Sequence, residues 1–142
     1  MRKTTEQLMN ELKNATNIDE FVERNQDEMV DMSLSEYLRE LLLKYNVERS
    51  AVFRRANMAE NNYGYELFRD DTKRASRDKL IQICIGFPLT IEEAQNVLRY
   101  GEVRPLYPRN QRDAYVLFAL KNKYDMFQLN ELLFERGEKI IE

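Results

Sequence analysis

The sequence predicts an all-α fold, and three observations lead to this class. The 142 residues include only four Gly and three Pro, so few positions interrupt a helix. No segment alternates apolar and polar residues over the length of a strand, and apolar residues instead recur at helical intervals. The composition, 43% hydrophobic and 33% charged, supports one compact core without disulfides or metal ions.

The composition also excludes several classes of function. The chain has no His, which removes Ser-His-Asp and Cys-His catalysis and zinc sites built on His. Its single thiol, Cys84, lies in an apolar run and is interpreted as a small buried hydrophobe in a reduced compartment. The sequence contains no glycine-rich phosphate loop, no Cys-x-x-Cys and no calcium loop. We therefore expect a protein that is not an enzyme and that has neither a cofactor nor a metal.

The start of the sequence favours a cytoplasmic location. The segment MRKTTEQLMNELKN becomes polar before a hydrophobic stretch of signal length develops. No stretch approaches the roughly 20 apolar residues that a membrane span needs. We expect no membrane partner.

Residues 1–32 are predicted to form an acidic helical extension. Residues 1–36 contain four basic and nine acidic residues, a net charge of −5. Apolar residues at helical spacing predict two short amphipathic helices here. These residues are Leu8, Met9 and Leu12, followed by Ile18, Phe21 and Val22.

The clearest helix lies within residues 33–46. Ser33 and Glu36 match a capping box at its start, and Asn46 marks its expected end. Its apolar residues follow the spacing of one buried face. They are Leu34, Tyr37, Leu38, Leu41, Leu42 and Tyr45.

Two shorter helices are predicted next. The first covers about residues 48–56 and exposes several arginines, and Asn57 marks the turn that follows. The second covers roughly residues 60–70, and Gly64 weakens it locally. The residues expected to face inward are Val52, Ala56, Leu67 and Phe68.

A fourth and a fifth helix follow directly. Ser76 is a good N-cap for the fourth, which closes at Gly86. Thr90 and Glu93 form a capping box for the fifth, and Gly101 is its expected C-terminal cap. The core faces are predicted to be Leu80, Ile83, Cys84 and Phe87 in the fourth helix, and Ala94, Val97 and Leu98 in the fifth.

Residues 102–142 are predicted to form a C-terminal helical pair after a connector that holds two prolines. Asn110 and Asp125 are the expected N-caps, and Gly137 ends the second helix. The predicted core faces are Ala114, Leu117 and Phe118, then Leu129, Leu132 and Leu133.

The segment YVLFAL, residues 115–120, is apolar over more than one helical stripe. We therefore expect one side of this pair to cover the core and the other side to meet a second copy in a homodimer. The alternative is a monomer with a larger core, and a monomeric mass in light scattering at micromolar concentration would favour it.

The helices over residues 35–45, 48–56 and 60–70 have the layout of a helix-turn-helix. Together with the next two helices they resemble the five-helix DNA-binding domain of phage-repressor-like regulators, the XRE family. The resemblance covers about residues 34–100, and its most specific stretch is YELFRDDTKRASRDKLIQICIGFPLTIEEAQNVL. In that family a basic turn, a small residue and Ser follow the recognition helix, and here these look like Lys73, Arg74, Ala75 and Ser76.

The sequence departs from the family pattern at two places. The family usually has Gly at the end of the recognition helix and Pro before the Ser. Here those places hold Asp70, Asp71 and Ala75.

The resemblance implies a repressor-like core over residues 33–101 and a transcriptional regulator that binds double-stranded DNA sequence-specifically as a dimer. Residues 48–79 hold eight basic and six acidic residues, so the basic surplus lies in the motif. The expected base contacts are Asn61, Asn62 and Tyr65. The expected phosphate contacts are Arg54, Arg55, Lys73, Arg74, Ser76 and Arg77.

Two other hypotheses stand beside this one. The expected recognition helix, AENNYGYELFRDD, carries four acidic residues and one basic residue, and the whole chain has a net charge of −3. This balance favours a non-catalytic helical module that keeps the repressor-like fold and binds a protein partner. Alternatively, the acidic N-terminal extension covers the basic face and competes with DNA, in which case deleting residues 1–32 should tighten DNA binding.

Overall fold

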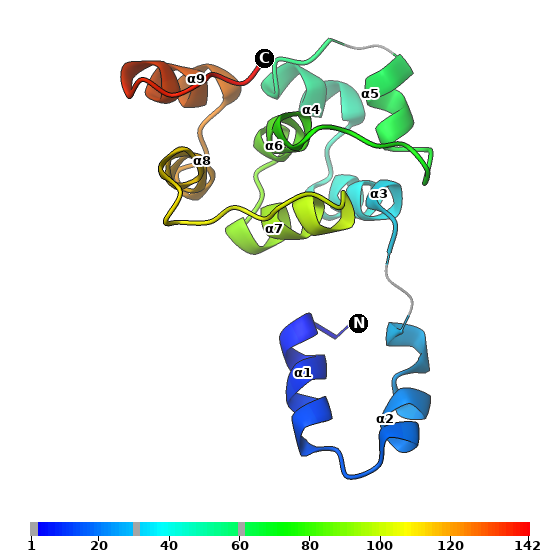
Figure 1. The fold of residues 1–142 in the computed structure, drawn as a ribbon. Coiled ribbons are helices and arrows are strands. Elements are labelled where there is room, and N and C mark those ends of the chain that lie inside the picture. Colours follow the sequence, from blue (N-terminus) through cyan, green and yellow to red (C-terminus); the bar gives the residue numbers. More distant parts are fainter. Residues whose placement is uncertain (1–2, 30–31, 60–61) are drawn as a thin grey trace. The chain divides into compact units, whose positions relative to one another are not determined.

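The computed structural model describes residues 3–29, 32–59 and 62–142 (Figure 1). All regular structure in these residues is helical, with nine α-helices and one short 3-10 helix, so the predicted all-α class is confirmed. The chain divides into two compact units, an N-terminal unit of residues Met1–Met32 and a main unit of residues Ser33–Glu142. Within the described residues no helix has the length and apolar character that crossing a membrane requires.

The N-terminal unit consists of α1 (Thr5–Asn14), α2 (Ile18–Arg24) and the 3-10 turn η1 (Gln26–Glu28). The two predicted helices are therefore present. Of their predicted apolar residues only Phe21 is buried, whereas Met9, Leu12, Ile18 and Val22 are exposed. The carboxamide of Asn25 is buried, where it accepts from Lys3 Nζ at 2.5 Å and donates to a Glu11 carboxylate oxygen at 2.7 Å. These hydrogen bonds tie the start of the unit to its last turn.

The main unit begins with α3 (Leu34–Tyr45), α4 (Arg49–Arg55) and α5 (Asn62–Leu67). The Ser33 hydroxyl accepts from the Glu36 amide at 3.2 Å, which is the N-cap half of the predicted capping box. Asn46 ends α3, as predicted, in the left-handed conformation at φ 51°. Asn57 is also left-handed, at φ 53°, which confirms the expected turn after α4.

The helix predicted over residues 60–70 is shorter in the structure, and residues 60 and 61 lie outside the described part of the chain. After Leu67 the amides of Phe68 and Arg69 bond to carbonyl oxygens three residues earlier, and the two aspartates that follow form side-chain hydrogen bonds. The Asp70 carboxylate accepts from the Thr72 amide at 2.9 Å in a local turn. The Asp71 carboxylate accepts from the hydroxyls of Ser33 and Ser35 near the start of α3.

Helix α6 (Arg77–Gly86) runs through the middle of the main unit, among helices α3, α4, α7, α8 and α9 (Figure 1). The predicted core face is buried, but every residue from Leu80 to Gly86 is buried as well. The predicted core face is therefore confirmed, and the further buried residues show that neighbouring helices cover the rest of this segment as well. The side-chain amide of Gln82 lies in this interior and donates to the Ala56 carbonyl oxygen at 2.8 Å, at the end of α4.

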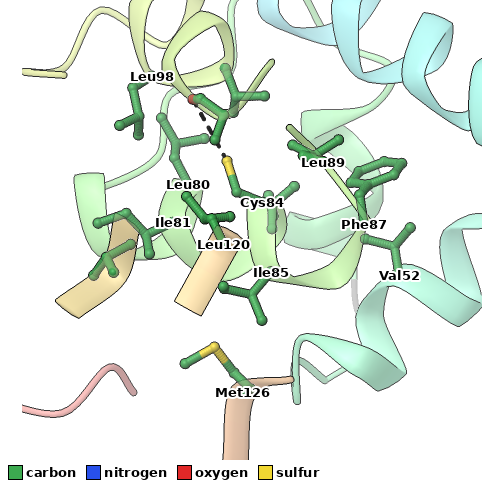
Figure 2. Close-up of a cluster of buried hydrophobic side chains, with 14 of the residues drawn as sticks. Val52, Leu80, Ile81, Cys84, Ile85, Phe87, Leu89, Leu98, Leu120 and Met126 are labelled. Carbon is green, nitrogen blue, oxygen red and sulfur yellow. Dashed lines mark hydrogen bonds between the residues drawn. The ribbon is translucent and has the colours of Figure 1, made fainter. Parts of the chain in front are cut away.

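Cys84 and Gly86 of α6 both make close contacts in the interior of the main unit. The Cys84 thiol is buried among apolar side chains and lies 3.9 Å from the Ala94 carbonyl oxygen (Figure 2). Burial raises the pKa of this thiol far above its ordinary value. At the end of the helix, the backbone of Gly86 lies against α4, and a Cβ at this position would be 2.5 Å from the Val52 carbonyl oxygen.

Helix α7 (Ile91–Tyr100) has the predicted capping box of Thr90 and Glu93. The largely buried Glu93 carboxylate also accepts from Lys44 Nζ at 2.5 Å and from the Tyr45 hydroxyl, which links α7 to the end of α3. Gly101 is the C-cap, as expected, and a Cβ there would lie 2.3 Å from Leu80 Cδ1. A side chain at residue 101 would thus meet the core.

The C-terminal pair consists of α8 (Gln111–Lys121) and α9 (Met126–Glu135), with the predicted N-caps Asn110 and Asp125. Gly137 follows α9 at φ 72°, which fits its predicted role in ending the helix. In α9 the predicted Leu129 and Leu133 are buried.

The predicted core face of α8 was wrong. The fully buried residues are Asp113, Val116, Ala119 and Leu120, whereas Ala114 and Leu117 are half-buried and Phe118 is exposed. The helix is rotated relative to the prediction because its buried carboxylate, Asp113, turns toward α6, where it binds an arginine.

Candidate nucleic-acid interface

Helices α4 and α5 are held together by Phe53. Its buried ring meets the edge of Tyr65 at a centroid distance of 5.2 Å and that of Phe68 at 5.7 Å. Gly64 allows α5 to approach, since a Cβ there would lie 3.1 Å from the Phe53 ring. The glycine that weakens this helix in the sequence therefore has a packing role.

The expected base contacts lie in this short helix or just before it. Tyr65 is half-buried against Phe53, and the guanidinium of Arg49 lies 4.8 Å from the centre of its ring. Asn61 lies outside the described residues, and Asn62 is the first residue of α5. The structure therefore shows Tyr65 in a packing contact, and the two asparagine side chains remain sequence predictions.

A basic turn follows α5 and lies against Tyr63. We use this name for Lys73 and Arg74. Lys73 Nζ forms an ion pair with Glu66 at 2.7 Å and lies 5.8 Å from the centre of the Tyr63 ring. The hydroxyl of Tyr63 donates to the Arg74 carbonyl oxygen at 3.2 Å, and the exposed Arg74 guanidinium pairs with Glu102 at 2.8 Å. Both cations of the turn therefore already have acidic partners, and the hydrogen bond to Glu66 raises the pKa of Lys73.

The two arginines at the end of α4 differ in their surroundings. Arg54 is exposed. Arg55 instead donates from Nε to the Ile85 carbonyl oxygen at 3.0 Å and from Nη2 to the Lys123 carbonyl oxygen at 2.8 Å. Arg55 thereby joins α4 to the end of α6 and to the loop between α8 and α9.

Arg77 is the most enclosed of the expected phosphate contacts. Its guanidinium donates to both carboxylate oxygens of the buried Asp113, at 3.0 and 2.8 Å, and to the carbonyl oxygens of Arg104 and Pro105. Burial alone would raise the pKa of Asp113, but the hydrogen bonds from Arg77 and from the Tyr107 amide outweigh it and lower that pKa.

A second arginine–aspartate pair joins α6 and α8, and here α8 supplies the arginine and α6 the aspartate. Arg112 at the start of α8 donates to both carboxylate oxygens of Asp78 in α6, at 2.9 and 3.0 Å. The hydrogen bonds from Arg112 lower the pKa of Asp78. Helix α6 thus begins with an Arg-Asp dipeptide, and α8 has one directly after its first residue, Gln111. The arginine of each dipeptide binds the aspartate of the other.

Beside these pairs lies an open groove with a volume of about 470 Å³, which we call the basic groove. It joins the start of α6 to the connector, to α8 and to the C-terminal tail. Ser76, the N-cap of α6, is among its residues and accepts from the Lys79 amide at 3.2 Å. The groove is lined by Ser76, Arg77, Asp78, Arg104, Arg112 and Lys139.

Sequence reasoning missed four of the six residues that line this groove, namely Asp78, Arg104, Arg112 and Lys139. Arg104, Arg112 and Lys139 come from a segment with seven basic and seven acidic residues, so its overall charge gives no signal. Arg-Asp dipeptides stand at residues 77–78 and 112–113, but a third one, at residues 69–70, takes no part in the contact, so this pattern alone does not mark the groove. Among the described residues no group of three Cys, Asp or Glu side chains has an arrangement that could hold a metal ion.

No family model matches the chain, and no curated protein or solved structure is significantly similar to it.

Proposed function

We propose that the protein is a transcriptional regulator that binds double-stranded DNA through α4 and α5. The observation that supports it is the packing of Tyr65 in the short helix α5, and of Phe68 just after it, against the Phe53 ring of α4, with the basic turn following α5 in the chain. In a helix-turn-helix the second helix enters the major groove, and the segment after it contacts the backbone. Asn62 and Tyr63 of α5, with the predicted base contact Asn61, would then meet bases. Arg54 of α4 and the basic turn, Lys73 and Arg74, would contact phosphates.

The contacts of the expected phosphate ligands divide them into two groups. Arg55 and Arg77 bind carbonyl and carboxylate oxygens of the main unit, so we give them a positioning role. Lys73 and Arg74 pair with Glu66 and Glu102 through exposed or half-exposed side chains. Such pairs are weak in water, and a phosphate can replace their acidic partners.

The basic turn gives a direct test of DNA binding. Lys73→Ala combined with Arg74→Ala should weaken binding to every duplex and lower the slope of log K against log salt by about 2, because two phosphate contacts are lost. Glu66→Gln should instead strengthen binding severalfold, since it frees Lys73 without changing the size of the side chain. Fluorescence anisotropy with a labelled duplex at roughly 50 to 200 mM salt measures both effects.

The matched control is Lys121→Ala with Arg136→Ala, which removes the same charge from two exposed residues outside the basic turn. Equal losses in the two double variants would show that only net charge matters. No binding by the unaltered protein even at the lowest salt would reject DNA as the partner.

A second candidate function is protein association through α9. Phe127 and Phe134 are 72% and 77% exposed, and their separation of seven residues places them on one face of this helix. Exposed aromatic side chains that share a face are typical of protein interfaces. We propose that this face is where two copies meet, as a dimeric DNA-binding protein requires.

Replacing both phenylalanines with serine tests this association. Phe127→Ser with Phe134→Ser should convert a dimer to a monomer in light scattering at micromolar concentration, with little change in thermal stability because neither side chain is in the core. Leu43→Ser is the matched control, since Leu43 on α3 is 83% exposed and stands apart from α9 in the sequence. A dimer that survives the double change, or a monomeric parent protein, would contradict the proposal.

A further inference from the structure

The basic groove retains positive charge after its internal pairs are counted. Asp113 is bound by Arg77 and Asp78 by Arg112, so both carboxylates are already neutralised. Arg104 and Lys139 are exposed, and neither side chain forms a hydrogen bond or an ion pair with any described residue. Arg104 also acts electrostatically on Asp113, Lys139 on Asp78 and Glu138 on Arg112. The groove and these acids thus hold four cations and three carboxylates, a net positive charge in a chain whose net charge is −3.

Hydrogen bonds to their backbone carbonyl oxygens hold Arg104 and Lys139 beside the groove. The carbonyl oxygen of Arg104 accepts from Arg77 Nε at 2.8 Å, and that of Lys139 accepts from Arg112 Nε at 2.9 Å. The same two arginines that bind the aspartates thus fix the connector and the tail on either side of the start of α6. The charged ends of Arg104 and Lys139 remain available to an anion.

The groove continues the path of the basic turn. Arg74 is two residues before Ser76, which lines the groove. A DNA backbone that passes the basic turn would therefore reach the groove next. Because phosphates repeat along the backbone, a second pair of cations on that path would contact further phosphates.

We propose that the C-terminal extension contributes directly to DNA binding, with Arg104 and Lys139 of the basic groove contacting backbone phosphates beyond those at the basic turn. This inference rests on the proposed function and extends it. It gives the connector and the tail a role in binding besides packing. Because phosphate contacts carry no base information, these two residues raise affinity for all sequences alike.

The experiment compares two double variants with equal charge loss. Arg104→Ala with Lys139→Ala removes the two exposed cations of the groove, and Lys121→Ala with Arg136→Ala is the control. Each full-length protein is titrated into a labelled random duplex at roughly 50 to 200 mM salt. In parallel, inorganic phosphate is titrated while NMR follows the backbone amides of Arg77 and Lys139. Circular dichroism checks that the variants remain helical.

The expected result is a salt slope reduced by about 2 in the groove variant and unchanged in the control. Equal slopes in the groove variant and the unaltered protein would overturn the inference and leave DNA binding through the basic turn in place. If the unaltered protein binds no duplex but phosphate shifts the groove amides, and the variant abolishes those shifts, DNA is rejected and the groove takes free phosphate groups. If neither probe binds, both proposals fail.

Discussion

Replacing Gly86 with alanine should destabilise the main unit by about 3 kcal/mol, the upper end of the range for overpacking a close-packed core. The new Cβ would lie 2.5 Å from the Val52 carbonyl oxygen and 2.6 Å from Val52 Cγ1. The nearest atom belongs to the backbone of α4, so no side-chain rotation relieves the clash and the two helices must separate. Thermal unfolding followed by circular dichroism should show a midpoint lower by roughly 10 °C.

Gly101→Ala provides the comparison for this prediction. Its Cβ would approach the end of the Leu80 side chain at 2.3 Å, and a terminal methyl group can shift more easily than a carbonyl oxygen. We expect a smaller loss of stability than at Gly86. If both variants unfolded at the same temperature, the prediction that the backbone contact of α4 with α6 tolerates an added methyl group less well than the Leu80 side chain would be wrong.

Replacing Asp113 with asparagine should cost about 3 kcal/mol, because it leaves the charge of Arg77 without its buried partner. The Asp113 side chain is 2% exposed, and asparagine has nearly the same shape, so the change removes charge with little effect on packing. Urea unfolding gives the free energy of unfolding. Asp78→Asn is the matched comparison, since the Asp78 side chain is 27% exposed and its pair with Arg112 should contribute less.

The same pairs predict how stability changes in acid. The pKa values of Asp113 and Asp78 are lowered in the folded protein, so their pairs stabilise it above the ordinary carboxyl pKa of about 4. This contribution is lost as the pH falls below that value and through the folded-state pKa values. The Asp113→Asn variant should therefore lose less stability than the unaltered protein between neutral pH and acid. Parallel acid dependence in both proteins would contradict the assignment.

The helix ends of the main unit were predictable because capping is local. Ser76, Thr90, Asn110 and Asp125 each accept from an amide three residues later, and such spacing is visible in the sequence. The position of α8 was not predictable in the same way. Its apolar residues fill more than one stripe, and the partner that selects the buried face is Arg77, 36 residues before Asp113.

In the candidate site, too, the sequence indicates which residues are basic but not which distant segments they contact. The sequence marks Arg55 and Arg77 as basic residues of a helix-turn-helix, but their acceptors lie in segments far along the chain. Arginines on a surface and arginines that join elements look alike without those partners. Conversely, Arg104 and Lys139 stand in a segment of balanced charge, and the fold alone brings them to the start of α6.

The burial of Cys84 has a practical consequence for measuring how often the core opens. The thiol is the only one in the chain, it is enclosed in the main unit, and its raised pKa suppresses the reactive thiolate. An alkylating reagent can therefore modify the native protein only after α6 is exposed. The rate at which Cys84 is alkylated would therefore report how often the main unit opens, and local fraying of α1 and α2 would not change it. The measurement needs no engineered probe.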